Sequence, residues 1–142
     1  MRDPLTGLGD HAAFNAALAR AEGREDVVIV LIGVDPAQTA DRRRACQASE
    51  RALRAVAAGV SAALRSGDEL FRVGRDRFAA LVAVADPREA HDVARRLRAS
   101  AGATGLSVGV ATAEPGDSGP AVLARAALAL GASRRPRREG VA

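Results

Sequence analysis

The chain has 142 residues, 48% of them hydrophobic, with three Phe and no Trp or Tyr. This length suits a single domain with an aliphatic core, and no apolar run reaches the roughly 18 residues of a membrane-spanning helix. The net charge is +4 and all 21 basic residues are arginines, which suits anionic partners. The lack of Trp and Tyr for base stacking, and of any nucleic-acid-binding motif, argues against nucleic acid.

Cysteine usage and the N-terminus favour the cytoplasm. Cys46 is the one cysteine of the chain and has no partner for an internal disulfide. No Cys/His cluster in the sequence has metal-ligand spacing, which argues against structural zinc. The N-terminus lacks the basic-then-apolar order of a signal peptide. We therefore predict one cytoplasmic domain over residues 1–142, with a basic tail from about residue 134.

The first part of the chain predicts a turn, a helix and a buried strand. Asp3-Pro4-Leu5-Thr6-Gly7-Leu8 is rich in turn-forming residues, and Asp10 can cap a following helix whose apolar residues recur every three to four positions. Residues 27–34 form a nearly uninterrupted run of β-branched and aliphatic residues, flanked by charges. Such a run is typical of a central strand that is buried on both faces.

The middle of the chain predicts a long helix and a hairpin. Small and apolar residues at helical spacing indicate a helix from about Thr39 to Leu64. Leu70 and Phe71 lead into a turn, and a mostly apolar run over 78–84 leads out of it. Two short apolar runs around a glycine-containing turn predict a β-hairpin.

The remainder of the chain predicts a helix, a strand and a closing helix. Asp86-Pro87 opens a helix that extends through Leu97, and the patterns predict a strand over 106–111, a loop over 115–119 and a helix over 120–133. Apart from the entry helix, the predicted order is βαββαβ. This order favours the α+β ferredoxin-like fold, with a mixed but mainly antiparallel sheet flanked by helices.

Several motifs carry a resemblance to a known family. The turn Gly74-Arg75-Asp76-Arg77-Phe78 resembles the five-residue turn that names the GGDEF domains of diguanylate cyclases, and it keeps the first, third and fifth residues. Asp3-x-Leu5-Thr6-Gly7-Leu8 resembles the segment that opens these domains, and Ser107-x-Gly109 resembles one of their strands. The resemblance covers nearly the whole chain and implies the nucleotidyl cyclase-like form of the predicted fold.

The resemblance implies that the catalytic machinery is degenerate. In the family, carboxylates at the end of the first core strand and at the fourth turn position hold the Mg²⁺ that activates GTP. These positions are Gly33 and Arg77 here, and Asp35 is the strand-end carboxylate that survives. Arg75 also replaces a glycine at which the nucleotide approaches the backbone. Because a guanidinium repels a metal ion, we predict an inactive domain with no catalytic residue, no metal and no cofactor.

The resemblance also implies a ligand site away from the turn. Arg65 and Asp68 match the family's Arg-x-x-Asp inhibitory site residue for residue, and Arg96 matches by spacing the arginine that completes it. An arginine that binds phosphate or guanine, beside a carboxylate that accepts guanine N–H groups, can hold cyclic di-GMP. Because this ligand commonly bridges two domains in the family, a ligand-bridged homodimer is a further expectation. Two alternatives stay open, a local salt bridge between Arg65 and Asp68, and a solvated helix face around Arg96.

Remnants of a nucleotide site are implied as well. Asp41 and Glu50 stand where family members contact guanine, and Arg134 and Arg138 stand where basic residues contact the triphosphate. Glu50 could instead pair with Arg54 one turn further on. The arginines could equally belong to a frayed tail.

These observations predict a catalytically inactive GGDEF domain that acts as a cyclic di-GMP receptor through Arg65 and Asp68. One alternative is a metal-independent GTP sensor, in which arginines supply the positive charge of the metal; these are Arg75, Arg77, Arg134 and Arg138. Another alternative is an interaction or dimerisation module that binds no nucleotide.

Overall fold

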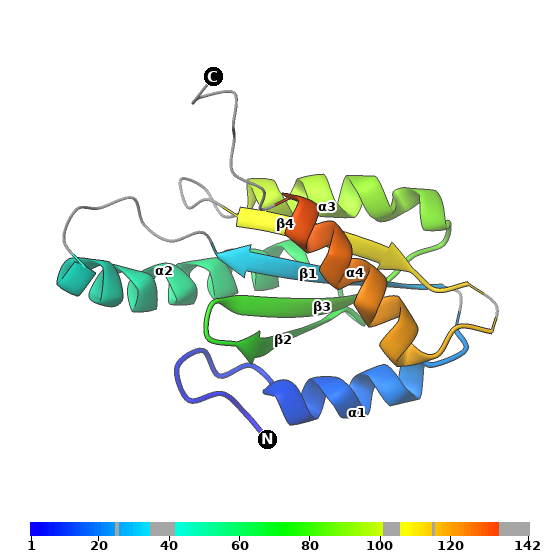
Figure 1. Cartoon of the computed structure of the whole chain (residues 1–142), viewed down its shortest axis with the longest axis horizontal. Helices are drawn as coiled ribbons and strands as arrows, with labels where there is room; N and C mark the ends of the chain where they lie inside the picture. The colour runs from blue at the N-terminus through cyan, green and yellow to red at the C-terminus, as the bar shows by residue number, and fades with distance from the viewer. Residues whose placement is uncertain (25, 35–41, 101–105, 115, 134–142) are drawn as a thin grey trace.

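The computed structural model describes residues 1–24, 26–34, 42–100, 106–114 and 116–133, and for residues 42–49, 87 and 133 it describes the backbone alone. Figure 1 shows a sheet with helices on both faces. The described elements, in chain order, are α1 (His11–Ala21), β1 (Val27–Val34), α2 (Arg42–Ala63), β2 (Glu69–Gly74), β3 (Arg77–Ala83), the short helix η1 (Pro87–Glu89), α3 (Ala90–Ala99), β4 (Leu106–Thr112) and α4 (Gly119–Ser133). Each strand and helix expected from the sequence is present.

The four strands lie in the order β2-β3-β1-β4. Val30 of β1 pairs with Ala80 of β3 on one side and with Val110 of β4 on the other, and both pairings are antiparallel. The βαββαβ order is confirmed, but the sheet is antiparallel between all neighbouring strands rather than mixed. The physical reason is the strand order. Strands β1 and β2 run in one direction and β3 and β4 in the other, and the order β2-β3-β1-β4 alternates the two directions.

The central strand β1 separates two apolar layers. All eight of its residues are buried, as its uninterrupted apolar run predicts. Val28, Val30 and Ile32 face the layer formed with α2 and α3, whereas Ile29 and Leu31 face the layer formed with α1 and α4. This alternation follows from the two-residue period of a strand.

Helix α4 packs against β4 at a glycine. A Cβ atom on Gly109 would lie 2.3 Å from the backbone nitrogen of Leu130 and 2.4 Å from the carbonyl oxygen of Ala126. The strand and the helix backbone therefore approach more closely than any other residue would permit. Within the described part of the chain, no helix has the length and apolar character to cross a membrane.

The β2–β3 hairpin runs along the length of β1, from one end of that strand to the other. Its turn lies at the end where β1 finishes, since Arg77 pairs with Gly33. At the other end, β2 starts at Glu69 and β3 finishes at Ala83, which pairs with Val27 at the start of β1. In Figure 1 the turn lies on the left, and the opposite end of the hairpin passes behind α4. The two candidate regions of the sequence therefore lie at opposite ends of the same hairpin.

Candidate functional site

The turn between β2 and β3 is fixed by contacts on both sides. Phe78, directly after the turn, is fully buried. The carbonyl oxygen of Asp76 accepts a hydrogen bond of 2.8 Å from the backbone N–H of Val34. The carbonyl oxygen of Arg75 accepts one of 2.8 Å from Nη2 of Arg72. The backbone of the turn is therefore held by β1 and by its own first strand.

Arg72 also ties the turn to the entry loop. Its Nη1 lies 3.0 and 3.2 Å from the two carboxylate oxygens of Asp3, and both side chains are only 15% exposed. Asp3 Oδ2 further accepts hydrogen bonds from the backbone N–H and the hydroxyl of Thr6, at 2.9 and 2.7 Å. Partial burial raises the pKa of Asp3, but the Thr6 hydrogen bonds and the Arg72 charge outweigh it and hold the pKa below its ordinary value. The aspartate of the opening motif thus has a structural role.

The turn itself presents positive charge. Arg75 and Arg77 are exposed, and neither forms an ion pair with a residue that the structure describes. The carboxylate of the turn, on Asp76, has its Oδ1 buried without a hydrogen-bond partner. Gly33, opposite Arg77 on β1, contributes no side chain. Two guanidinium groups therefore stand here without a paired carboxylate in the described structure.

At the other end of the hairpin, Asp68 closes the turn that begins at Arg65. Its Oδ2 accepts a hydrogen bond of 2.9 Å from the backbone N–H of Arg65, and its Oδ1 accepts one of 3.0 Å from the backbone N–H of Ala83. Gly67, between them, has a φ of 95°, a conformation that glycine adopts readily. The guanidinium of Arg65 is exposed and forms no ion pair with any described residue. The expected alternative of a salt bridge between Arg65 and Asp68 is therefore wrong, because the carboxylate binds backbone N–H groups instead.

The packing of α2 against α3 brings Arg96 toward the same end. A Cβ atom on Gly59 of α2 would lie 2.4 Å from the carbonyl oxygen of Ser100, directly after α3. The helices run in opposite directions, because α2 leads to the start of β2 and α3 leads away from the end of β3 (Figure 1). Arg96 lies one turn before Ser100, and Ala63 lies one turn after Gly59. Arg96, which is exposed, is thus level with the end of α2 that leads to Arg65.

A cavity that the sequence did not predict opens beside this turn. It has a volume of about 130 Å³ and is lined in part by Gly67, Ala83 and Glu69, together with Arg20 and Arg24. A signal was present in the sequence, since two arginines four residues apart stand at the end of the first helix. Only the folded structure shows that they lie beside a hairpin more than 40 residues further along the chain.

One of these arginines has a carboxylate partner. Arg24 donates two hydrogen bonds to Asp26, from Nε to Oδ1 at 3.1 Å and from Nη2 to Oδ2 at 2.9 Å, and both side chains are 55% exposed. The pKa of Asp26 is lowered, first by its hydrogen bond from Arg24. Another anion at this position would have to compete with Asp26 for the guanidinium of Arg24.

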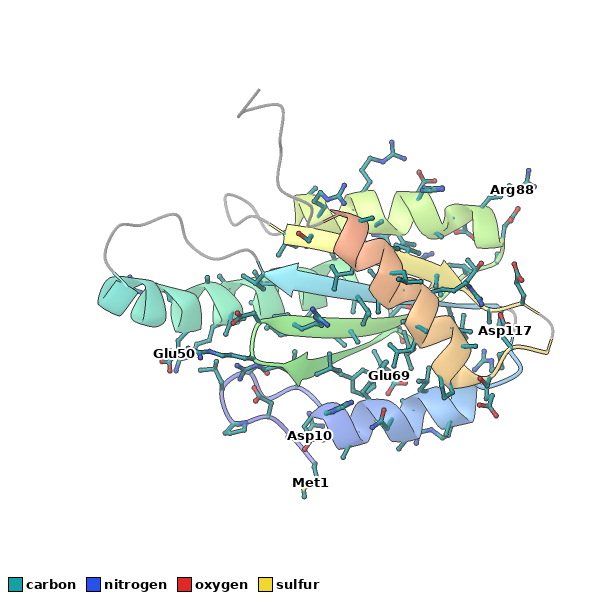
Figure 2. All side chains as sticks on the ribbon, viewed as in Figure 1. Met1, Asp10, Glu50, Glu69, Arg88 and Asp117 are labelled. Atoms are coloured by element: carbon teal, nitrogen blue, oxygen red, sulfur yellow. The ribbon has the colours of Figure 1, made fainter. Side chains whose placement is uncertain are left out.

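Of the residues expected to remain from a nucleotide site, the structure describes Glu50 alone. Asp35, Asp41, Arg134 and Arg138 lie outside the described residues. Glu50 is exposed on α2, in the N-terminal half of that helix (Figure 2). Its expected ion pair with Arg54 is not formed in the described part of the chain, so that interpretation is wrong.

Comparison with known protein families gives a single result. The family model described as "Diguanylate cyclase, GGDEF domain" matches residues 1–139. The chain belongs to the GGDEF domain family. Comparison with curated protein sequences finds no match.

Solved structures of other GGDEF domains are similar to this one. The diguanylate cyclase SiaD of Pseudomonas aeruginosa is 25% identical with a TM-score of 0.83, over 94% of this chain and 58% of its own. The coiled coil and GGDEF domain of DgcB from Caulobacter crescentus, in complex with cyclic di-GMP, is 26% identical with a TM-score of 0.80, over 94% of this chain and 80% of its own. The GGDEF domain of TpbB, or YfiN, from P. aeruginosa is 27% identical with a TM-score of 0.80, over 95% of this chain and 89% of its own. This GGDEF domain therefore spans little more than half of SiaD and most of the other two.

The Mg²⁺ site that membership of the family implies does not fit the residues of this GGDEF domain. Gly33 and Arg77, which occupy the two expected ligand positions, face each other across β1 and β3. Glycine has no side chain and a guanidinium contains no oxygen, so neither residue has a side-chain ligand for a metal. Among the described residues, no group of three or more His, Cys, Asp or Glu side chains is arranged to hold a metal ion.

Proposed function

We propose that this GGDEF domain is a catalytically inactive receptor for cyclic di-GMP. The ligand binds at Arg65 and Asp68, in the turn directly before the β2–β3 hairpin. The observation that carries the proposal is that Arg65 is exposed and forms no ion pair with a described residue. Gly67 of the same turn lines a cavity that Arg20, Arg24 and Glu69 also line. Cyclic di-GMP carries two phosphates and two guanines, and arginine binds both groups through paired N–H donors. DgcB, which is 26% identical, forms a complex with the same ligand.

The carboxylate of Asp68 is held in a fixed orientation and retains binding capacity. A carboxylate has about four acceptor positions, and the backbone N–H groups of Arg65 and Ala83 use two of them. The remaining positions can accept the N1–H and N2–H groups of a guanine. Because the side chain is already ordered, binding costs little additional side-chain entropy.

Further positive charge surrounds the site. Arg96 stands level with the end of α2, and Arg20 and Arg24 line the cavity on the α1 side. Arg24 would exchange its exposed partner Asp26 for a phosphate. This arrangement places cations on two sides of the Arg65 turn, which suits a ligand with two phosphates.

The lack of cyclase activity is the second half of the proposal. Gly33 removes a carboxylate, Arg77 replaces another with a cation, and Arg75 adds a long side chain where a nucleotide would approach the backbone. The test is incubation of the protein with GTP and Mg²⁺, with no cyclic di-GMP expected. Production of cyclic di-GMP at a rate that Arg77→Ala abolishes would overturn this half.

Calorimetry with cyclic di-GMP tests the binding half. Wild type should bind, and Arg65→Ala should lose at least about tenfold in affinity, because one charge-assisted pair is worth roughly 1.5–3 kcal/mol. Arg98→Ala is the matched control, since Arg98 is exposed on α3 and has no ion pair with described residues. Absence of binding to wild type, or equal binding by Arg65→Ala, would favour a module that binds no nucleotide at this site. Sedimentation with and without ligand tests whether the ligand bridges two copies.

A further inference from the structure

We propose that Arg72 is a latch with two alternative carboxylate partners, Asp3 on the entry loop and Asp76 on the hairpin turn. In the structure the guanidinium binds Asp3, and the entry loop, residues 1–9, is docked against the hairpin. When the loop detaches, the guanidinium transfers to Asp76. The latch joins the position of the loop to the state of the turn, and it does not depend on the binding of cyclic di-GMP.

The entry loop is held together by its own hydrogen bonds. The backbone N–H of Asp3 donates to the carbonyl oxygen of Leu8 at 2.6 Å, and the backbone N–H of Gly7 donates to the carbonyl oxygen of Asp3 at 2.8 Å. Nη1 of Arg2 donates to the carbonyl oxygen of Gly7, also at 2.8 Å. Because these bonds lie within the loop, they do not have to break when it leaves the hairpin. The loop can therefore move as one piece.

Arg72 joins this piece to the hairpin twice. Its backbone N–H donates to the carbonyl oxygen of Gly9 at 2.9 Å, and its Nη1 binds both carboxylate oxygens of Asp3. Figure 1 shows the loop beside β2, close to the hairpin turn. Docking also packs Leu5 and Leu8, which are partly buried, against the core. The attachment thus has an apolar part in the two leucines and a polar part that depends on one residue.

The second partner is indicated by two buried polar atoms without a hydrogen-bond partner among the described residues. They are Nε of Arg72 and Oδ1 of Asp76. The guanidinium is already close to Asp76, because its Nη2 lies 2.8 Å from the carbonyl oxygen of Arg75, in the peptide group that precedes Asp76. A buried donor and a buried acceptor that lack partners each cost free energy. An ion pair between Arg72 and Asp76 removes both costs.

The two pairings exclude each other. With Nη1 on Asp3 and Nη2 on the carbonyl oxygen of Arg75, the planar guanidinium is fixed in an orientation that leaves Nε without an acceptor. Release of Asp3 frees Nη1 and allows the group to turn toward Asp76. A mostly buried cation then keeps a counter-charge, and the loss of one is what makes broken buried pairs costly.

The exchange of partners makes the loop and the turn a two-state element. Release is less costly than the loss of the Asp3 pair alone implies, but it still requires Leu5 and Leu8 to leave the core. In the docked state Oδ1 of Asp76 is unpaired among the described residues, and in the released state Asp76 is bound by Arg72. A contact that moves residues 1–9 therefore changes the charge pairing of the turn.

Hydrogen exchange of single amides, measured by NMR on the whole chain, tests the latch. The amide of Arg72 is protected by its bond to Gly9 and exchanges when the loop detaches, whereas the amide of Val30, in the buried central strand, reports global unfolding. Asp76→Asn removes the second partner and so disfavours the released state. Exchange at Arg72 should slow by about fivefold, the effect of losing one partly exposed ion pair, and exchange at Val30 should not change.

Two comparisons complete the experiment. The control Asp92→Asn removes the same charge from an exposed position on α3 and should leave exchange at Arg72 as in wild type. Urea denaturation then compares Asp76→Asn in two backgrounds. With Asp3 present the substitution should leave the midpoint unchanged, and in Asp3→Asn, where Arg72 has only Asp76, it should lower the midpoint.

Four results would overturn the proposal. One is unchanged exchange at Arg72 in Asp76→Asn. Another is equal slowing at Val30, which would mean that the substitution only relieves a buried carboxylate in the docked state. The third is slower exchange at Arg72 in the Asp92→Asn control. The last is the same effect of Asp76→Asn on the urea midpoint with and without Asp3.

Discussion

Truncation of Arg72 should destabilise the entry loop and the hairpin turn together. The side chain joins them, with Nη1 at 3.0 Å from Asp3 and Nη2 at 2.8 Å from the carbonyl oxygen of Arg75. Both Arg72 and Asp3 are 15% exposed. Loss of either partner therefore leaves the other one mostly shielded from water and without its counter-charge.

The size of the effect follows from this burial. Removal of one partner from a fully buried pair costs about 3–5 kcal/mol, and a hydrogen bond to a charged group contributes about 1.5–3 kcal/mol. We expect about 3 kcal/mol for Arg72→Ala and a similar loss for Asp3→Ala, which also removes the two Thr6 hydrogen bonds. The double variant should lose about 4.5 kcal/mol, which leaves a coupling energy of about 1.5 kcal/mol. For a chain of this length Arg72→Ala should lower Tm by roughly 10 °C.

Urea denaturation followed by circular dichroism measures the four free energies of unfolding. The matched control is the pair Arg24 and Asp26, which is also joined by two hydrogen bonds but whose side chains are 55% exposed, so that its coupling should not exceed about 1 kcal/mol. If the Arg72 and Asp3 losses add to within about 0.5 kcal/mol, the side chains do not act as a pair and the reasoning fails.

Further predictions concern packing, pH and metal. Gly109→Ala should destabilise the fold by about 2 kcal/mol or more, because its Cβ would lie 2.3 Å from the α4 backbone. Gly131→Ala should stabilise it by about 0.5–1 kcal/mol, because its Cβ would meet nothing within 4 Å. Chemical denaturation of both variants checks this, and equal effects would refute it. Because the pKa of Asp3 is lowered in the folded state, its contribution to stability is complete above the ordinary value of 3.8 and is lost as the pH falls through the lowered pKa. Unfolding free energies measured from pH 5 to pH 2 should therefore fall less steeply for Asp3→Asn than for wild type, and equal slopes would contradict the assignment. Addition of Mg²⁺ should leave Tm unchanged, and an increase that EDTA reverses would show a metal site.

The fold followed from the sequence because local patterns and tertiary packing agree in this chain. The run over 27–34 is apolar throughout because β1 is buried on both faces. The order βαββαβ then left few topologies, although the strand neighbours that make the sheet antiparallel were not visible in any single segment. Tight contacts at Gly59 and Gly109 were also invisible, since an isolated helix or strand gives no sign of what packs against it.

For the candidate site, the sequence offered residues but not their geometry. Arg65 and Asp68 do lie in one turn, but the sequence could not show that Asp68 binds the backbone N–H groups of Arg65 and Ala83. The hydrogen bond from Ala83 depends on the position at which β3 ends, 15 residues after Asp68 in the chain. The position of Arg20 and Arg24 beside the hairpin was missed for the same reason, because only the folded sheet brings that part of the chain to the hairpin.

The length of β3 separates the arginines of the hairpin turn from the proposed cyclic di-GMP site. Its seven residues place Arg77 and Ala83 about 20 Å apart at the usual rise of a strand. Electrostatic screening at physiological salt acts over about 8 Å, so the charge of Arg77 would scarcely act on an anion held beside Ala83. The loss of that charge in Arg77→Ala should therefore leave the midpoint of a cyclic di-GMP titration unchanged.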